Sequence, residues 1–261
     1  MHLNTWNEFR HAVYGCFLQG KDALFNLLDA LLSECEAQSL IELSLSPHFQ
    51  RTWDSVYEAL SDGKIDEGRL RELFLEYLAR PALDQPLRIG IDASNIARPK
   101  AVTSPDRSGQ KVPNLPDGEQ AITYGWQFST VVALPATPGS WTYVLDQRRI
   151  ETSTTAAQVA ALQLARLAPH LPKNTLAYMD RGYDSAWLWC QLSGLPITGT
   201  LIRLKGNRCF YRPAPPPTGK RGAPRKWGDK LQPSDKATHA DRLCCKNAER
   251  NTRNGSALAY S

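Results

Sequence analysis

The sequence lacks the features of an exported, membrane-bound or disulfide-stabilised protein. Its first residues, MHLNTWNEFR, contain no apolar core of a signal peptide, and its longest apolar runs are far too short to cross a bilayer. The six cysteines form no CxxC pair and no cysteine–histidine spacing typical of zinc sites. We therefore expect reduced thiols, a cytoplasmic protein and no membrane partner.

Charge is distributed unevenly along the 261 residues. From Leu201 onward the chain has 14 Lys and Arg against 4 Asp and Glu, whereas the residues before it have 17 against 22. A basic last quarter favours an anionic polymer such as a nucleic acid as partner. A solvated basic tail without a partner is the alternative.

Residues 1–80 are predicted to form an N-terminal helical domain. Leu24, Leu27 and Leu31 follow the spacing of one apolar helix face, and the same spacing recurs from Leu70 to Leu78. Such helices form either a packing module or, less readily, a helix-turn-helix that binds DNA. Residues 81–86 are predicted to be a linker.

Residues 87–205 are predicted to contain strands and helices in the order strand, hairpin of two strands, helix, strand, helix, strand. A long loop, rich in proline, glycine and charge, is expected over residues 96–120. The expected strands are Leu87–Asp92, Ile122–Leu134, Trp141–Ile150, Thr175–Asp180 and Ile197–Lys205, and the expected helices are Thr155–Ala168 and Asp184–Leu192.

This order predicts an α/β fold with a ribonuclease-H-like mixed sheet flanked by helices. In that topology the first strand is central, and the fourth lies beside it in parallel after a right-handed crossover. Asp92 and Asp180, which end these two strands, would then be neighbours. Asp92 alone could equally be a strand-end residue that caps the next turn.

Two neighbouring carboxylates repel each other unless a cation lies between them. Magnesium and manganese accept such oxygen ligands, and a two-ion site can activate a nucleophile and stabilise a leaving alkoxide in phosphodiester cleavage. We expect Asp92 and Asp180 to bind Mg²⁺ or Mn²⁺. Asp184 is a rival second ligand, but it is interpreted as the N-cap of the following helix.

Several sequence motifs carry a resemblance to a known family. They are IGIDAS, ARP, TSPDR, YGWQFSTVVAL, SWTYVLDQRRI, MDRGYDS and LIRLKGNRCFYRPAPPPTGKRGAPRKWGDK. In these motifs the sequence resembles the DDE-type insertion-sequence transposases, which have a ribonuclease-H-like catalytic domain. The resemblance extends from the N-terminal helices to about Asp235. It implies that Asp92 and Asp180 are catalytic, that the partner is the DNA of insertion-sequence ends, that the chain acts as a homodimer, and that it is associated with the nucleoid.

Residues 206–261 are predicted to be a basic loop rich in Pro, Arg and Lys, followed by a disordered tail. Cations neutralise phosphates, and the interleaved Phe210, Tyr211 and Trp227 suit stacking on unpaired bases. By the same resemblance, strand residues just before this loop contact the DNA backbone. The expected DNA-binding residues are Arg203, Lys205, Arg208, Arg212, Lys220, Arg221, Arg225 and Lys226.

The third catalytic residue of these transposases, a glutamate on a later helix, has no counterpart here. After Glu151 the only glutamate is Glu249, in a stretch without a helical apolar pattern. The chain is therefore interpreted as a truncated, inactive copy whose reading frame changes after Asp235; a divergent disordered tail over 236–261 is the alternative. Two other functions remain open: a non-catalytic DNA-binding fragment that interferes with an intact transposase, and a ribonuclease-H or Holliday-junction nuclease.

Overall fold

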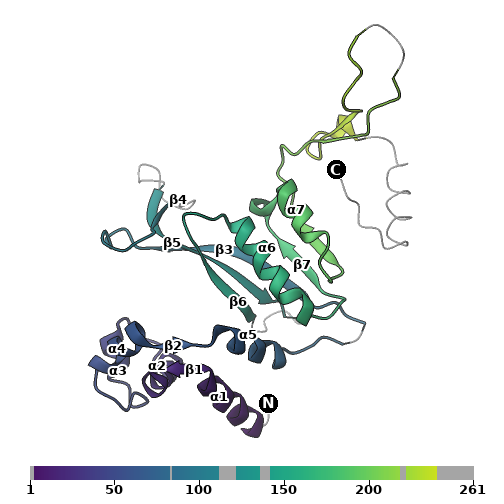
Figure 1. Cartoon of the computed structure of the whole chain (residues 1–261). Coiled ribbons are helices and arrows are strands. Elements are labelled where there is room, and N and C mark those ends of the chain that lie inside the picture. Colours follow the sequence, from purple (N-terminus) through teal and green to yellow (C-terminus); the bar gives the residue numbers. More distant parts are fainter. Residues whose placement is uncertain (1–2, 83, 112–121, 136–141, 218–221, 240–261) are drawn as a thin grey trace. The chain divides into compact units, whose positions relative to one another are not determined.

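The computed structural model describes residues 3–82, 84–111, 122–135, 142–217 and 222–239. The chain divides into two compact units, Met1–Ala79 and Arg80–Ser261 (Figure 1). Each unit has its own buried residues, and each is described here by itself.

The first unit is built from helices whose apolar faces form two clusters. One cluster gathers Cys16, Phe17 and Leu73, and the other gathers Leu27 and Val56. Helices form at both leucine-rich stretches as predicted. The expected apolar face of the first is wrong at Leu31, which is 57% exposed, because Ala30 takes the buried position beside Leu27. The helices are α1 (Leu3–Cys16), α2 (Lys21–Ser33), α3 (Leu40–Ser44), α4 (Asp54–Asp62) and α5 (Glu67–Glu76).

The prediction that this unit is entirely helical is wrong in one respect. A short antiparallel ladder joins β1 (Phe17–Gln19) to β2 (Lys64–Ile65). Gly20 follows β1 with a φ of 68°, a left-handed conformation that lets the chain turn directly into α2. Strands of three and two residues are too short to show an alternating pattern, so they could not be predicted from the sequence.

The second unit contains a six-stranded mixed sheet. β5 lies next to β3, β3 next to β7, and β7 next to β8, while β4 and β6 pair with successive parts of β5 on its other side. The strands are β3 (Arg88–Ala97), β4 (Ser108–Lys111), β5 (Ile122–Ala133), β6 (Tyr143–Ile150), β7 (Leu176–Met179) and β8 (Gly199–Ile202).

The strand directions confirm the predicted ribonuclease-H-like arrangement. β3 is central, antiparallel to β5 and parallel to β7, and β7 is parallel to β8. β5 and β6 form the expected antiparallel pair. The fold class is therefore α/β, with a mixed sheet flanked by helices.

Two predicted boundaries around the first strand are wrong. β3 does not end near Asp92 but continues to Ala97, because its second half keeps pairing with β5 up to Gly125. The expected loop over 96–120 includes β4, which pairs with the first residues of β5. A strand that leaves its parallel neighbour but keeps its antiparallel one cannot be recognised from a single-sequence pattern.

Helices α6 (Ala156–Leu167) and α7 (Ala186–Leu192) pack against each other, and α6 packs on β5 and β6 (Figure 1). Thr155 and Gln158 form a capping box that begins α6. Gln163 is fully buried; its Nε2 donates to the backbone oxygen of Ser129 at 3.1 Å, and its Oε1 accepts from the Ser129 hydroxyl at 2.7 Å.

After β8 the chain forms a small two-stranded ribbon and one 3₁₀ turn, and two further 3₁₀ turns occur earlier in this unit. Residues 206–239 thus contain regular structure where the sequence indicated a loop. The ribbon strands are β9 (Phe210–Tyr211) and β10 (Lys230–Leu231), and the 3₁₀ turns are η1 (Ala168–His170), η2 (Arg181–Tyr183) and η3 (Lys236–Thr238).

Candidate metal and DNA site

The two aspartates singled out by the sequence lie at matching positions of neighbouring parallel strands. The last pair of the ladder between β3 and β7 is Ile91 with Met179; Asp92 is the next residue of β3, and Asp180 directly follows the end of β7. Adjacent strands are about 4.8 Å apart, and residues in register project from the same face of a sheet. Both aspartates are exposed. The structure therefore places the two aspartates at matching positions at the carboxyl ends of neighbouring strands, and the charges of both act on the nearby Tyr183 hydroxyl.

The turn after β7 orients Asp180. Its Oδ1 accepts a hydrogen bond of 2.7 Å from the Gly182 N–H, so Asp180 caps the η2 turn. A Cβ at Gly182 would lie 2.9 Å from the same oxygen. A side chain at this position would push the Asp180 carboxylate away, so glycine preserves the hydrogen bond that orients it.

Tyr183 lies buried close to both aspartates, with 3% of its surface exposed. Burial raises the pKa of its hydroxyl to about 12; the neighbouring Ser129 hydroxyl opposes this, while the charges of Asp92 and Asp180 raise the pKa further. The phenol therefore stays neutral at physiological pH, and no further negative charge is added beside the carboxylates.

This raised pKa predicts a loss of stability in alkali. Tyrosine in an unfolded chain ionises near pH 10. The stabilisation is complete below that pH and is lost as pH rises toward the native value of about 12, because only the unfolded phenol ionises in this window. Between pH 9 and 11 the unfolding free energy of the wild type should fall more steeply than that of Tyr183→Phe, in urea titrations. The half-exposed Tyr124 supplies the control, Tyr124→Phe; parallel curves for all three proteins would contradict the expectation.

A third strand brings a cation to the same edge. Ile202 of β8 pairs with Met179 of β7, and the Arg203 N–H donates to the Met179 oxygen at 3.2 Å. Arg203 thus lies at the position next to Asp180. Arg203 and Lys205 are both exposed. Two carboxylates and then a guanidinium follow one another across three parallel strands.

Asp184 does not have the role that the sequence suggested. The N-cap of α7 is Ser185, whose hydroxyl accepts from the Leu188 N–H at 3.2 Å. Asp184 is 1% exposed and faces Lys205 and Arg208 instead. Its carboxylate is therefore no ligand for a cation shared with Asp180, and this pairing across 24 residues left no trace in the sequence.

Arg208, one of the expected DNA-binding residues, is held by this carboxylate. Its Nη2 lies 2.9 Å from Asp184 Oδ1, and its guanidinium lies 5.2 Å from the Trp189 ring centre. It is only partly exposed, unlike Arg203 and Lys205. Phosphate binding by Arg208 stays a prediction, and its structural partners argue for another role.

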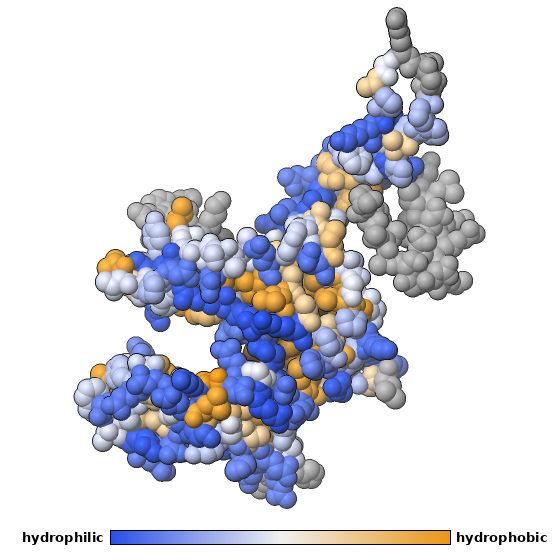
Figure 2. Space-filling view, in the orientation of Figure 1, coloured by the Kyte–Doolittle hydropathy of each residue, from blue (hydrophilic) through white to orange (hydrophobic). Residues whose placement is uncertain are grey.

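The remaining expected DNA-binding residues lie around the β9–β10 ribbon. Arg212, Arg225 and Lys226 are exposed, whereas Lys220 and Arg221 fall outside the described residues. The rings of Tyr211 and Trp227 lie 6.1 Å apart, and each is about half exposed. The surface of this segment is mostly hydrophilic in Figure 2. The ribbon therefore displays cations beside two accessible aromatic faces.

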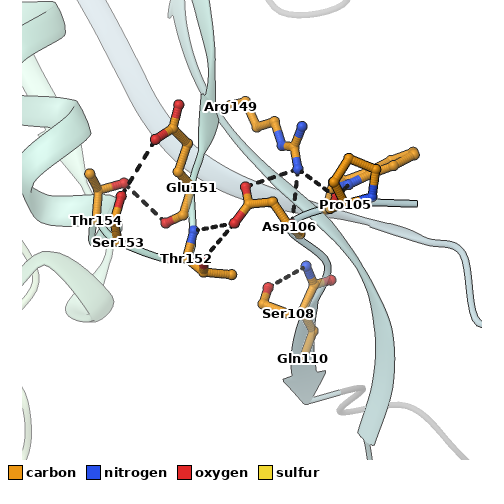
Figure 3. A network of polar contacts seen from close by, with 10 residues as sticks. Pro105, Asp106, Ser108, Gln110, Arg149, Glu151, Thr152, Ser153 and Thr154 are labelled. Atoms are coloured by element: carbon orange, nitrogen blue, oxygen red, sulfur yellow. Dashed lines mark hydrogen bonds and ion pairs between the residues drawn. The ribbon is translucent and has the colours of Figure 1, made fainter. Parts of the chain in front are cut away.

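The TSPDR motif has a structural role that the sequence analysis missed. Figure 3 shows Asp106 accepting hydrogen bonds from the Thr152 hydroxyl and, at 3.0 Å, from the Thr152 N–H, while Arg149 Nη2 donates to Asp106 Oδ2 at 2.9 Å. The hydrogen bonds from Thr152 lower the pKa of Asp106. Asp106 has a φ of 54°, and this network holds it there. This hydrogen-bond network fastens the turn before β4 to the residues that follow β6.

The two aspartates suit a hard divalent cation. Magnesium prefers oxygen ligands and takes one or two carboxylates together with water and substrate phosphate. Asp92 and Asp180 are adjacent and exposed, so they fit a shared cation of this kind. Within the described ranges no group of three or more His, Cys, Asp and Glu side chains could hold a metal.

In the same ranges no helix has the length and apolar character needed to cross a bilayer.

The sequence of the chain shows its family. No curated protein sequence matches the chain. Among solved structures, the chain is similar to a piggyBac transposase in a synaptic complex with hairpin DNA, with 16% identity and a TM-score of 0.39 over 72% of this chain; it spans 42% of that chain's length. The family described as DDE superfamily endonuclease matches residues 12–257. That match includes nearly the whole chain. The chain therefore belongs to the DDE superfamily endonucleases.

Proposed function

We propose that the chain is a DNA transposase of a bacterial insertion sequence, and that it binds the DNA of the element ends. The observation that carries this proposal is the row formed by Asp92, Asp180 and Arg203 at one edge of three parallel strands. Carboxylates there bind a divalent cation, and the adjacent cation binds the phosphate backbone. Membership of the DDE endonucleases supports the same chemistry.

Within this proposal the residues have distinct tasks. Asp92 and Asp180 are the metal ligands, and Arg203 and Lys205 neutralise the phosphates next to the bond to be cut. A Mg²⁺ or Mn²⁺ ion, or a pair of them in a complete site, would supply an activated water and stabilise the leaving oxygen. Residues 87–205 carry this chemistry, and the basic segment after them carries further backbone contacts.

We also propose that this chain is an inactive, truncated copy. The support is that the only glutamate after Glu151 is Glu249, which lies in a stretch without a helical apolar pattern and outside the described residues. Two ligands hold a cation more weakly than three, so strand cleavage and transfer are lost while DNA binding is kept. The alternative function, a non-catalytic fragment that competes with an intact transposase for element ends, follows from the same observation. A homodimer in the nucleoid is the assembly that paired DNA ends require.

The first experiment measures metal binding by the two aspartates. Manganese binding in the presence of duplex DNA, followed by electron paramagnetic resonance, should weaken roughly tenfold or more in Asp92→Asn and in Asp180→Asn. Glu58→Gln removes an exposed carboxylate of the first unit and should bind manganese like the wild type. Unchanged manganese binding in both aspartate variants would overturn the proposed metal site.

Cleavage then decides between the candidate functions. Supercoiled plasmid should be nicked only at background level by the wild type, Asp92→Asn and Asp180→Asn, with Mg²⁺ or Mn²⁺, while gel shifts show DNA binding by all three. Nicking by the wild type alone would show an active transposase and contradict the proposed inactivity. Cleavage of RNA–DNA hybrids would favour a ribonuclease-H function. Absence of DNA binding would overturn the whole proposal.

A further inference from the structure

Asp184 is a buried carboxylate whose partners come from the segment after β8. Its side chain has no exposed surface, and an unpaired charge in such a place would be strongly destabilising. Its Oδ2 accepts hydrogen bonds from the Lys205 N–H at 2.8 Å and from Arg208 Nε at 3.0 Å. Arg208 Nη2 also lies 2.9 Å from Oδ1. One carboxylate thus fixes both ends of the segment from Lys205 to Arg208.

Arg208 is fixed from several directions. Its Nη2 donates to the Asp184 backbone oxygen at 2.6 Å, and the Trp189 ring stacked on Phe210 lies beside the guanidinium. A guanidinium with bidentate carboxylate contacts, a backbone acceptor and an aromatic neighbour is held in one geometry. Phosphate would have to displace these contacts to bind it.

The contact between Asp184 and Arg208 connects the segment after β7 to the segment after β8. Both segments leave the sheet at the acidic edge, the end of the sheet where Asp92 and Asp180 lie. Asp184 follows Asp180 by four residues after β7, and Lys205 follows Arg203 by two residues after β8. The backbone that carries Arg203 and Lys205 is therefore fastened to the segment after Asp180 by a contact that neither of their side chains makes.

We propose that Asp184 and Arg208 are positioning residues that hold Arg203 and Lys205 against the DNA phosphate beside the acidic pair. This inference rests on the proposed function. It reassigns Arg208 from direct phosphate contact to support. Charge alone makes the opposite prediction for Asp184, since removing a carboxylate makes the site more positive and should strengthen DNA binding.

The test is DNA affinity measured by fluorescence anisotropy on a labelled 30-base-pair duplex at several salt concentrations. Asp184→Asn, which keeps the size of the side chain, should weaken binding roughly tenfold at 0.1 M salt and reduce the slope of log K against log salt by about 1–2, because two phosphate contacts are lost. Arg208→Ala should have the same effect. Equal or tighter binding by Asp184→Asn would overturn the inference while leaving the proposed function intact.

The same substitutions in a variant that lacks Arg203 and Lys205 distinguish a positioning role of Asp184 and Arg208 from a general loss of structure. In the double variant Arg203→Ala, Lys205→Ala, the further change Asp184→Asn or Arg208→Ala should leave affinity unchanged, since nothing remains to be positioned. A further loss with Arg208→Ala would show direct phosphate contact instead. A further loss with Asp184→Asn, or its failure to fold by circular dichroism, would show a structural role only. If the wild type itself does not bind the duplex, the proposed function fails first.

Discussion

Raising the salt concentration from 50 to 200 mM is expected to weaken DNA binding by roughly 10²–10³-fold. Each phosphate neutralised by a cation releases counterions, so the slope of log K against log salt is about −0.9 for each contact. Under the proposed function, five exposed cations of the second unit make such contacts, which gives an expected slope of about −4 to −5. They are Arg203, Lys205, Arg212, Arg225 and Lys226.

Reversing the charge at the acidic edge tests where these contacts are made. The double variant Arg203→Glu, Lys205→Glu should lose most of its affinity at 0.1 M salt and have a shallower slope. The control is Lys173→Glu, because Lys173 is exposed and precedes β7 at the opposite end of the strand. The control reverses one charge and the double variant two, so a control loss half as large in log K as that of the double variant would show that binding follows net charge and not this edge.

Leu164→Ala in α6 is expected to reduce the free energy of unfolding by about 2–5 kcal/mol. Leu164 has no exposed surface in the helix that covers β5 and β6, so the change removes buried apolar area and leaves a cavity. Urea denaturation followed by circular dichroism measures the effect. A loss of this size is a large share of the stability of an ordinary domain.

The same helix provides the control for this substitution. Leu162 is 46% exposed and two positions away, so Leu162→Ala should change the unfolding free energy by less than about 0.5 kcal/mol. Similar costs for the two variants would mean that α6 is not packed on the sheet through Leu164. A cost at Leu164 alone would locate the core of the second unit between this helix and β5.

The regular elements of this fold could be predicted because their signals are local. The leucine spacing of α2, the capping box residues before α6 and the alternating run of β5 each lie within one element. The strand order then predicted the parallel neighbours β3 and β7, and with them the meeting of Asp92 and Asp180.

The contacts that support the site could not be predicted, because they join residues far apart in the chain. Asp184 looked like a helix cap from its neighbours alone, whereas its partner Arg208 lies on the other side of β8. Asp106 is fastened to Thr152, 46 residues away, by the same kind of long-range contact. Only the folded sheet brings such residues within hydrogen-bonding distance.

The last strand of the sheet also bears on the behaviour of the chain without DNA. β8 pairs with β7 on one side, and within the described ranges no strand covers its other side. Such open edges invite strands of other molecules to add to a sheet and start aggregation. β8 has only four residues and is followed at once by Arg203 and Lys205. Like charges on two approaching copies repel, so the cations that we assign to phosphate also keep free copies of the protein apart.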